Sequence, residues 1–126
     1  MAKKFSITQA PTFVGNVPVP RIGGEAVDVP FTFRYMDREA LADLYSSWGE
    51  RHRDLAKRAD ELKLPEYTSE QIIIQVEQIK EVVEAWGFDE PFDDLHIRAL
   101  VASARSVPEA ILAAYARAYD EARLGN

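Results

Sequence analysis

Apolar and polar residues alternate through the first third of the chain, as is typical of β-strands. Every second residue from 27 to 35 is apolar, and Val17 and Val19 alternate with Pro18 and Pro20 further upstream. In a strand, this period of two places the apolar side chains on one face. Proline has no backbone N–H to donate, so the upstream run is predicted to be either an edge strand or irregular.

Gly23 and Gly24 separate the two runs and predict a β-hairpin over about residues 11–35, since glycine readily adopts the positive φ that tight turns require. A two-residue loop would place Val19 opposite Asp28, an apolar residue beside a polar one. We therefore expect an odd loop of about three or five residues with a bulge, which places Val17 and Val19 beside apolar partners.

From Asp37 onward the apolar residues recur with the period of an α-helix, so residues 37–124 are predicted to be helical. Asp37 is the expected N-cap of a first helical segment, and Leu64 followed by Pro65 is expected to close it. Residues 68–71 (TSEQ) match a capping box and predict the start of a second helix. Gly87 is its expected C-terminal residue.

The second predicted helix has a broad apolar stripe, and two shorter helices are predicted to follow it. Residues 89–91 (DEP) are expected to open the third helix, whose apolar positions are Leu95, Ala99 and Leu100. Residues 106–109 (SVPE) form another capping box and open the fourth. The stripe of the second helix consists of Ile72, Val76, Ile79, Val83 and Trp86.

These elements predict an α+β fold in a single domain of 126 residues. It consists of an N-terminal β-hairpin with edge-type strands, over about residues 11–35, followed by about four α-helices in a small helical bundle.

Composition excludes several classes of function. The chain has no cysteine, so disulfides and thiolate sites are absent, and this suits an intracellular protein. Its net charge of −6 disfavours nucleic acid as a partner, because a phosphate backbone would be repelled. No apolar run is long enough to span a membrane, and the first residues do not match a signal peptide.

A search for catalytic chemistry finds no site. His52 and His96 are the only histidines and belong to no zinc motif, and no serine lies in a nucleophile elbow. We therefore predict no catalytic residue, no cofactor and no metal site, and expect a protein that is not an enzyme. One alternative stays open: His96, with the acidic residues at 89, 90, 93 and 94, could hold a divalent cation.

The unusual feature is the amount of apolar surface on the second predicted helix. Ile72, Ile73, Ile74 and Val82 cannot all share one helical face with the core stripe, because neighbouring residues point about 100° apart. Either this helix is buried on two sides, or these four residues bind another protein. The open edge of the hairpin is a second candidate docking surface, through addition of a strand.

The order and spacing of several segments resemble the tail assembly chaperones of long-tailed (siphophage-type) phages and prophages. The resemblance covers most of the chain and is weakest over residues 50–65, which are rich in charge. The segments are residues 10–13 (APTF), 17–25 (VPVPRIGGE), 29–35 (VPFTFRY), 37–41 (DREAL), 44–48 (LYSSW), 86–89 (WGFD), 108–111 (PEAI) and 121–126 (EARLGN).

The resemblance implies a binding function without catalysis. Such proteins are similar in holding the long, helical, aggregation-prone tape measure protein soluble while tail tube subunits are recruited around it. The implied partners are therefore the tape measure protein and the tail tube protein, with self-association as a further candidate. The implied location is the host cell cytoplasm, and the protein is not expected in the mature virion.

A second function fits the same composition. A small structural phage tail or head-completion protein would have similar length and charge, but it would be found in purified particles. The metal-dependent alternative built on His96 would be exposed by a rise in thermal stability with divalent cations.

Overall fold

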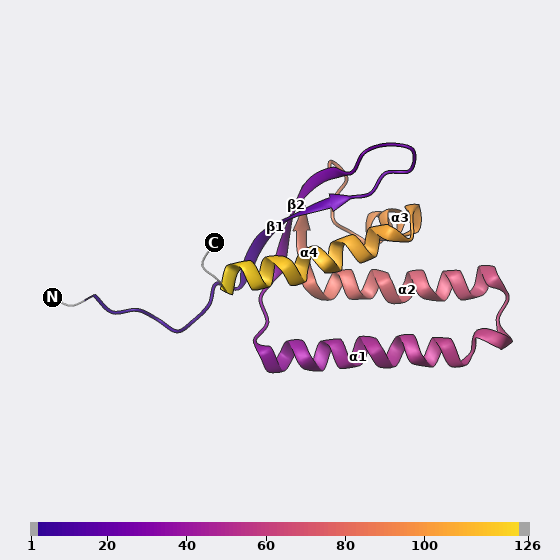
Figure 1. Ribbon diagram of the computed structural model, residues 1–126, viewed down its shortest axis with the longest axis horizontal. Helices are drawn as coiled ribbons and strands as arrows, with labels where there is room; N and C mark the ends of the chain where they lie inside the picture. The colour runs from indigo at the N-terminus through magenta and orange to yellow at the C-terminus, as the bar shows by residue number, and fades with distance from the viewer. Residues whose placement is uncertain (1–2, 124–126) are drawn as a thin grey trace.

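The computed structural model describes residues 3–123 and places a three-stranded sheet among helices (Figure 1). The α+β fold with an N-terminal hairpin is confirmed, and a third strand joins it. The expected helical end at residue 124 lies outside the described residues. The elements are β1 (Thr12–Val19), β2 (Val27–Arg34), α1 (Arg38–Lys57), the short 3-10 helix η1 (Ala59–Glu61), α2 (Leu64–Val82), β3 (Val83–Trp86), α3 (Asp94–Ser103) and α4 (Ser106–Arg123).

The hairpin pairs apolar residues with apolar residues, as the sequence predicts. Val17 lies opposite Val29, and Val19 lies opposite Val27. The loop is odd but longer than expected, because residues 20–26 all lie outside the strands, and the β1–β2 ladder has no bulge. Gly23 at its centre has φ +75°, the conformation that favours glycine.

The strand order is β1-β2-β3, so β1 is an edge strand, as predicted, and β2 is central. The Pro30 carbonyl accepts a 2.9 Å hydrogen bond from the N–H of Gly87, the residue just after β3. In an antiparallel strand the nitrogen and the carbonyl of one residue face the same side, so the Pro30 nitrogen also faces away from β1. Pro18 lies opposite Asp28, and by the alternation of an antiparallel ladder it faces the outer edge. Neither proline removes a bond from the β1–β2 ladder.

The prediction of a helix through Val83 and Trp86 is wrong, because these residues form β3. Val83 has φ −109° and ψ 136°, and its side chain is 0 % exposed. β3 pairs with β2 through Phe31 opposite Trp86 and Phe33 opposite Val83, with an irregularity between Thr32 and Phe33. Consecutive β-branched residues at 82 and 83 favour this change, since they suit a pleated surface better than a helix. Gly87 therefore follows a strand and does not cap a helix.

The predicted starts of the second and third helices are also wrong. α2 begins at Leu64, with Pro65 in its first turn and the Lys63 N–H donating to Glu66 Oε1 at 2.9 Å, so residues 68–71 lie inside the helix. Pro65 therefore lies at the start of α2 and does not end the previous helix. An N–H in the first turn of a helix has no partner within the helix, so proline, which lacks this group, is tolerated there. α3 begins at Asp94, with Asp93 as N-cap, later than residues 89–91, and α4 begins at Ser106 as expected to within one residue.

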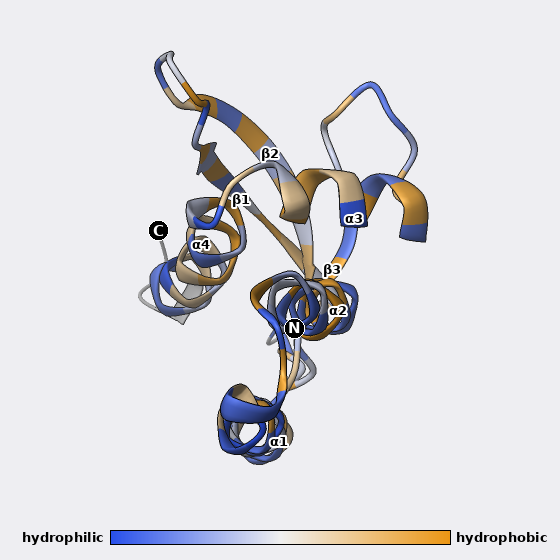
Figure 2. Ribbon diagram, turned by 90° about the vertical axis from the view of Figure 1, so that its right-hand side faces the viewer, coloured by the Kyte–Doolittle hydropathy of each residue, from blue (hydrophilic) through white to orange (hydrophobic). Residues whose placement is uncertain are grey.

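One hydrophobic cluster joins the sheet to α2, α3 and α4. The inner face of the sheet contributes Val17, Val29, Phe31 and Phe33, and α4 packs along β1. Figure 2 shows α2 between the sheet and α1, so that α1 is the outermost helix. Of the apolar positions expected for the third helix, Leu95 is 73 % exposed, and the buried residues of α3 are Ile97 and Val101.

Candidate protein-binding surfaces

The four apolar residues predicted to bind a partner have different environments on α2. Val82 is 0 % exposed and belongs to the core, so it is not part of an accessible surface. Ile72 is half-buried and packs against the core cluster, and Ile74 is also half-buried. Ile73 is 48 % exposed, so it is the residue of the four that is open to a partner.

The breadth of the apolar surface on α2 is explained mainly by burial on two sides. The sheet, α3 and α4 cover one side, and α1 covers another. The α1 side is joined by polar contacts: Trp48 Nε1 donates to Glu81 Oε1 at 3.0 Å, and Arg51 Nη2 lies 3.0 Å from Glu81 Oε2. His52 Nε2 lies 3.2 Å from Gln78 Oε1.

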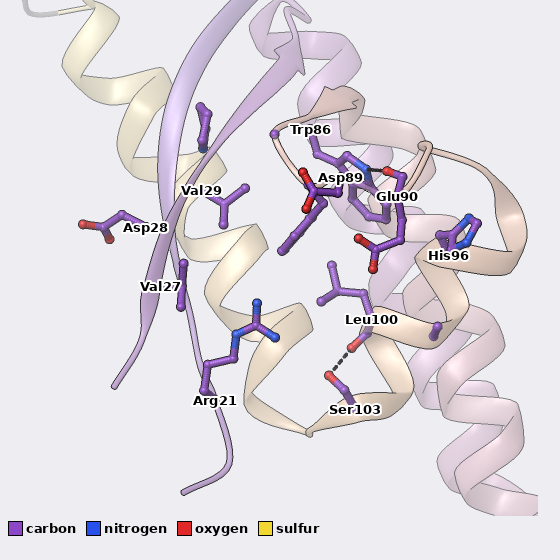
Figure 3. Close-up of a pocket in the computed structure, with 14 residues that line it drawn as sticks. Arg21, Val27, Asp28, Val29, Trp86, Asp89, Glu90, His96, Leu100 and Ser103 are labelled. Carbon is purple, nitrogen blue, oxygen red and sulfur yellow. Dashed lines mark hydrogen bonds between the residues drawn. The ribbon is translucent and has the colours of Figure 1, made fainter. Parts of the chain in front are cut away.

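A groove lies between β2, the loop after β3, and α3, and we call it the β2–α3 groove. Its volume is about 460 Å³. Val29 and Leu100 point toward each other across it (Figure 3), and Trp86 and Phe88 add aromatic surface. Charged groups stand at its rim: Arg21 approaches from the hairpin loop, and Asp89 and Glu90 lie on the opposite side.

The groove also contains an unpaired stretch of sheet edge. β3 pairs with Phe31, Thr32 and Phe33, and the Gly87–Pro30 bond is the last contact in that direction. Peptide groups two residues apart in a strand point the same way, so the Asp28 N–H and C=O face the groove beyond β3. Within residues 3–123, no strand pairs with this part of β2 on the groove side. The Asp28 side chain points away from the groove (Figure 3).

The upper wall of the groove is held by close packing and one hydrogen bond. Trp86 Nε1 donates to the Glu90 carbonyl at 2.8 Å, which fixes the loop that carries Asp89 and Glu90. A Cβ on Gly87 would lie 2.8 Å from Pro30 Cγ, so only glycine permits this approach. The groove is thus a preformed feature of the fold.

The acidic cluster around His96 is a helix N-terminus with internal partners. Asp93 Oδ1 accepts bonds from the His96 backbone N–H at 2.9 Å and lies 2.7 Å from His96 Nδ1. The backbone bond, more than the imidazole, lowers the pKa of Asp93. Asp94 Oδ1 lies 2.8 Å from Lys80 Nζ. Among the described residues, no group of three or more potential ligands could hold a metal ion.

The outer edge of β1 is open as well. Thr12, Val14 and Asn16 present their backbone groups away from β2 by the alternation of the ladder, and the Val14 side chain is 67 % exposed. The sequence predicted this edge. It did not predict the β2–α3 groove, because that groove exists only where β3 ends early, in a segment that we expected to be helical.

Comparison with known proteins places these surfaces in context. A family model described as phage tail assembly chaperone matches residues 1–126, which is the full chain. Neither the curated proteins nor the solved structures contain a match to the chain. None of the helices within residues 3–123 combines the length and apolar character needed to cross a membrane.

Proposed function

The chain belongs to the phage tail assembly chaperone family, and from this premise we propose that it binds the tape measure protein of its phage and keeps it soluble. The family is non-catalytic, and membership implies binding of phage tail proteins. The match over the full chain is the observation that carries the proposal. The identity of the tail protein is the step that we add.

Exposed apolar side chains on ordered elements support binding of an aggregation-prone helical partner. Ile73 on α2 is 48 % exposed, and Ile72 and Ile74 beside it are half-buried. A single side chain of this kind contributes little, but several copies of a small protein along one long chain add up by multivalency. Such a reversible contact suits a chaperone, which must leave when the tail tube is built.

We assign the contact on α2 to Ile73 together with the exposed parts of Ile72 and Ile74. Val82 is left out, because its side chain is wholly buried. The salt bridges Arg51–Glu77 and Arg58–Glu70 run along the α1 side of the same helix. Glu70 and Glu77 lie three residues before and four residues after Ile73, so Ile73 lies on the same flank of α2, beside the contact with α1, and is 48 % exposed there.

The same proposal includes recruitment of tail tube subunits to the bound tape measure protein. Tail assembly chaperones act in the host, and we place this chain in the host cell cytoplasm and outside the finished virion. The competing assignment is a small structural tail or head-completion protein. Mass spectrometry of purified particles separates the two, since a structural protein is retained in them.

The test is co-expression with the tape measure protein from the same gene cluster. We expect the tape measure protein to move from the pellet to the soluble fraction when this chain is present, and to co-purify with it. Ile73→Ser should reduce the soluble fraction several-fold, because it removes the exposed apolar contact on α2. Circular dichroism and thermal unfolding of the variant should match the unchanged chain.

Leu95→Ser is the control, since it removes an apolar side chain from a different helix that is more exposed than Ile73, 73 % against 48 %. It should retain more of the soluble tape measure protein than Ile73→Ser does. Equal insolubility with and without the chain would contradict the tape measure assignment. Equal effects of the two serine variants would contradict the assignment of the contact to α2.

A further inference from the structure

The two halves of α1 are attached to the rest of the molecule in different ways. In the first half, Leu41 and Leu44 pack against the main hydrophobic cluster, and Trp48 belongs to it. In the second half, Leu55 is 4 % exposed but lies outside that cluster. Since α1 packs mainly on α2 and is the outermost helix (Figure 2), its second half depends on α2 for its position.

Ion pairs join the second half of α1 to α2. Arg51 Nη1 lies 3.5 Å from Glu77 Oε2, and its Nη2 lies 3.0 Å from Glu81 Oε2. Arg58 Nη2 lies 3.4 Å from Glu70 Oε1. All five side chains are partly exposed. Ion pairs that water reaches contribute little to stability and are screened by salt, so this half of α1 is held weakly.

A small apolar contact lies within the polar one. Leu55 lies between the two arginines of α1, and Ile74 lies between the first two of the three glutamates of α2. Because the two helices run antiparallel (Figure 1), this register places Leu55 beside Ile74. Ile74 is half-buried and, like Leu55, lies outside the main cluster. Movement of the second half of α1 would therefore uncover Ile74 and the three carboxylates without opening the main core.

Gly49 separates the two halves of α1. Glycine inside a helix is less favourable than alanine, because the backbone loses more freedom on folding. The three atoms nearest to a Cβ at this position all belong to Arg53, with Nη1 at 3.1 Å. They form the end of a flexible, exposed side chain, so packing does not require glycine here. Gly49 thus weakens α1 at the boundary between the half that packs on the core and the half that ion pairs hold.

We propose that residues 50–58, which we call the α1 strap, cover a binding strip on α2 and give way to an amphipathic helix of the partner. The strip consists of Ile73, Ile74 and the carboxylates of Glu70, Glu77 and Glu81. A helix fits the strip, because a helix of this chain already lies on it. The partner helix must carry arginine or lysine beside its apolar residues, as the strap does, since the three carboxylates would otherwise lose their counter-charges.

The strap accounts for the small exposed surface of α2. Ile73 lies beside the strap and is the part of the strip that is open in the closed chain, while the rest stays covered until a partner helix replaces the strap. The apparent affinity for that helix is then lowered by the fraction of molecules that are closed. The inference rests on the proposed function only in taking α2 as the helix that contacts a partner.

The probe for the test is a fluorescein-labelled peptide of residues 38–61 with Gly49→Ala, a change that favours the helix, and binding is followed by fluorescence anisotropy. Leu55→Ala in the full chain loosens the strap and leaves α2 intact. We expect this variant to bind the peptide several-fold more tightly than the unchanged chain, because more molecules are open. Arg58→Ala should act in the same direction to a smaller extent, and it keeps the test decisive if Leu55→Ala does not fold.

Leu44→Ala is the matched control, because it makes the same substitution in the half of α1 that packs on the core. It should leave the affinity for the peptide close to that of the unchanged chain. This control separates local opening of the strap from a general loss of stability, which circular dichroism and thermal unfolding would measure for each variant.

Charge and closure are tested separately. A peptide that also carries Arg51→Glu and Arg58→Glu should bind Leu55→Ala several-fold more weakly, because it places carboxylates against those of α2. The chain has no native cysteine, so Arg51→Cys and Glu77→Cys in one chain can be joined by a short bismaleimide. The joined chain should lose binding of the original peptide, whereas the same variant before cross-linking should retain it.

Four results would overturn the proposal. They are equal affinity of the loosened and unchanged chains, equal binding of the two peptides, binding that survives the cross-link, and dimers of Leu55→Ala without peptide, which would assign the strip to a second copy. None of these measurements contains the tape measure protein. The strap can therefore fail its test while co-expression still shows that the chain keeps the tape measure protein soluble, and the reverse also holds.

Discussion

Gly15 on β1 lies where a side chain would clash with α4 and with the neighbouring strand. A Cβ at this position would lie 2.8 Å from Ala118 Cβ and 3.0 Å from Phe33 Cε2. Neither neighbour can yield easily, because Phe33 is 0 % exposed and α4 packs along the whole strand. The missing side chain at this position therefore allows helix and sheet to share one core.

Gly15→Ala should lower the free energy of unfolding by about 1–3 kcal/mol, the usual cost of overpacking a core. Urea denaturation monitored by tryptophan fluorescence would measure it. Gly24→Ala is the control, because the nearest atom to its Cβ would be Arg21 Cβ at 3.9 Å, and a surface substitution of this kind stays within about 0.5 kcal/mol. Equal stabilities of the two variants would mean that β1 and α4 do not rely on this contact.

At the scale of elements, α1 depends on α2 for its position. Its fully buried side chains are Trp48 and Leu55. Leu41 and Leu44 are only partly buried against the core cluster, and polar groups make the rest of the contact. Glu81 is central to that contact, since it accepts from the Trp48 indole and from Arg51. A helix with few buried apolar contacts is expected to open locally before the core does.

Glu81→Ala should lower the free energy of unfolding by about 1–2 kcal/mol, because the indole N–H and the guanidinium lose a charged acceptor. Hydrogen exchange should accelerate in α1 while the amides of α2 and the sheet stay protected. Glu70→Ala serves as control: its carboxylate lies 3.4 Å from Arg58 at the surface, and exposed pairs of this kind are worth less than about 1 kcal/mol. Uniform acceleration across all elements would refute a separately opening α1.

The elements also show where sequence reasoning reaches its limit. Local signals were sufficient for the hairpin, for the N-cap Asp37, whose Oδ1 accepts from the Ala40 N–H at 2.9 Å, and for the start of α4. The end of the second helix was missed because Val83 and Trp86 fit a helical stripe as well as a strand. Pairing with Phe31 and Phe33 decides between them, and such a long-range partner leaves no mark in the local pattern.

The same distinction holds for the candidate surfaces. The sequence identified Ile72, Ile73 and Ile74 as surplus apolar residues, but it could not say which of them α1 would cover. It gave no sign of the β2–α3 groove, since the groove depends on the early end of β3 and on the position of α3. The exposure of a side chain depends on the assembled fold. The sequence could therefore identify these side chains as candidates, but it could not show which of them is exposed.

At the scale of the whole molecule, exposed apolar side chains lie on more than one helix. Ile73 lies in the middle of α2, whereas Leu95 lies in the first turn of α3 and is 73 % exposed. A contact that belongs to α2 should therefore be lost on substitution of Ile73 and largely kept on substitution of Leu95.

We expect Ile73→Ser to lower the soluble fraction of the tape measure protein while the mass of the chain alone stays unchanged, because the substitution removes a surface side chain and no core packing. If several copies act along one tape measure protein, the loss should exceed that expected of one side chain, because every copy makes the same weakened contact. Co-expression, together with light scattering of the chain alone after size exclusion, would measure both. A change in the mass of the chain alone would show that Ile73 serves contacts between copies, and its assignment to the tape measure protein would then be wrong.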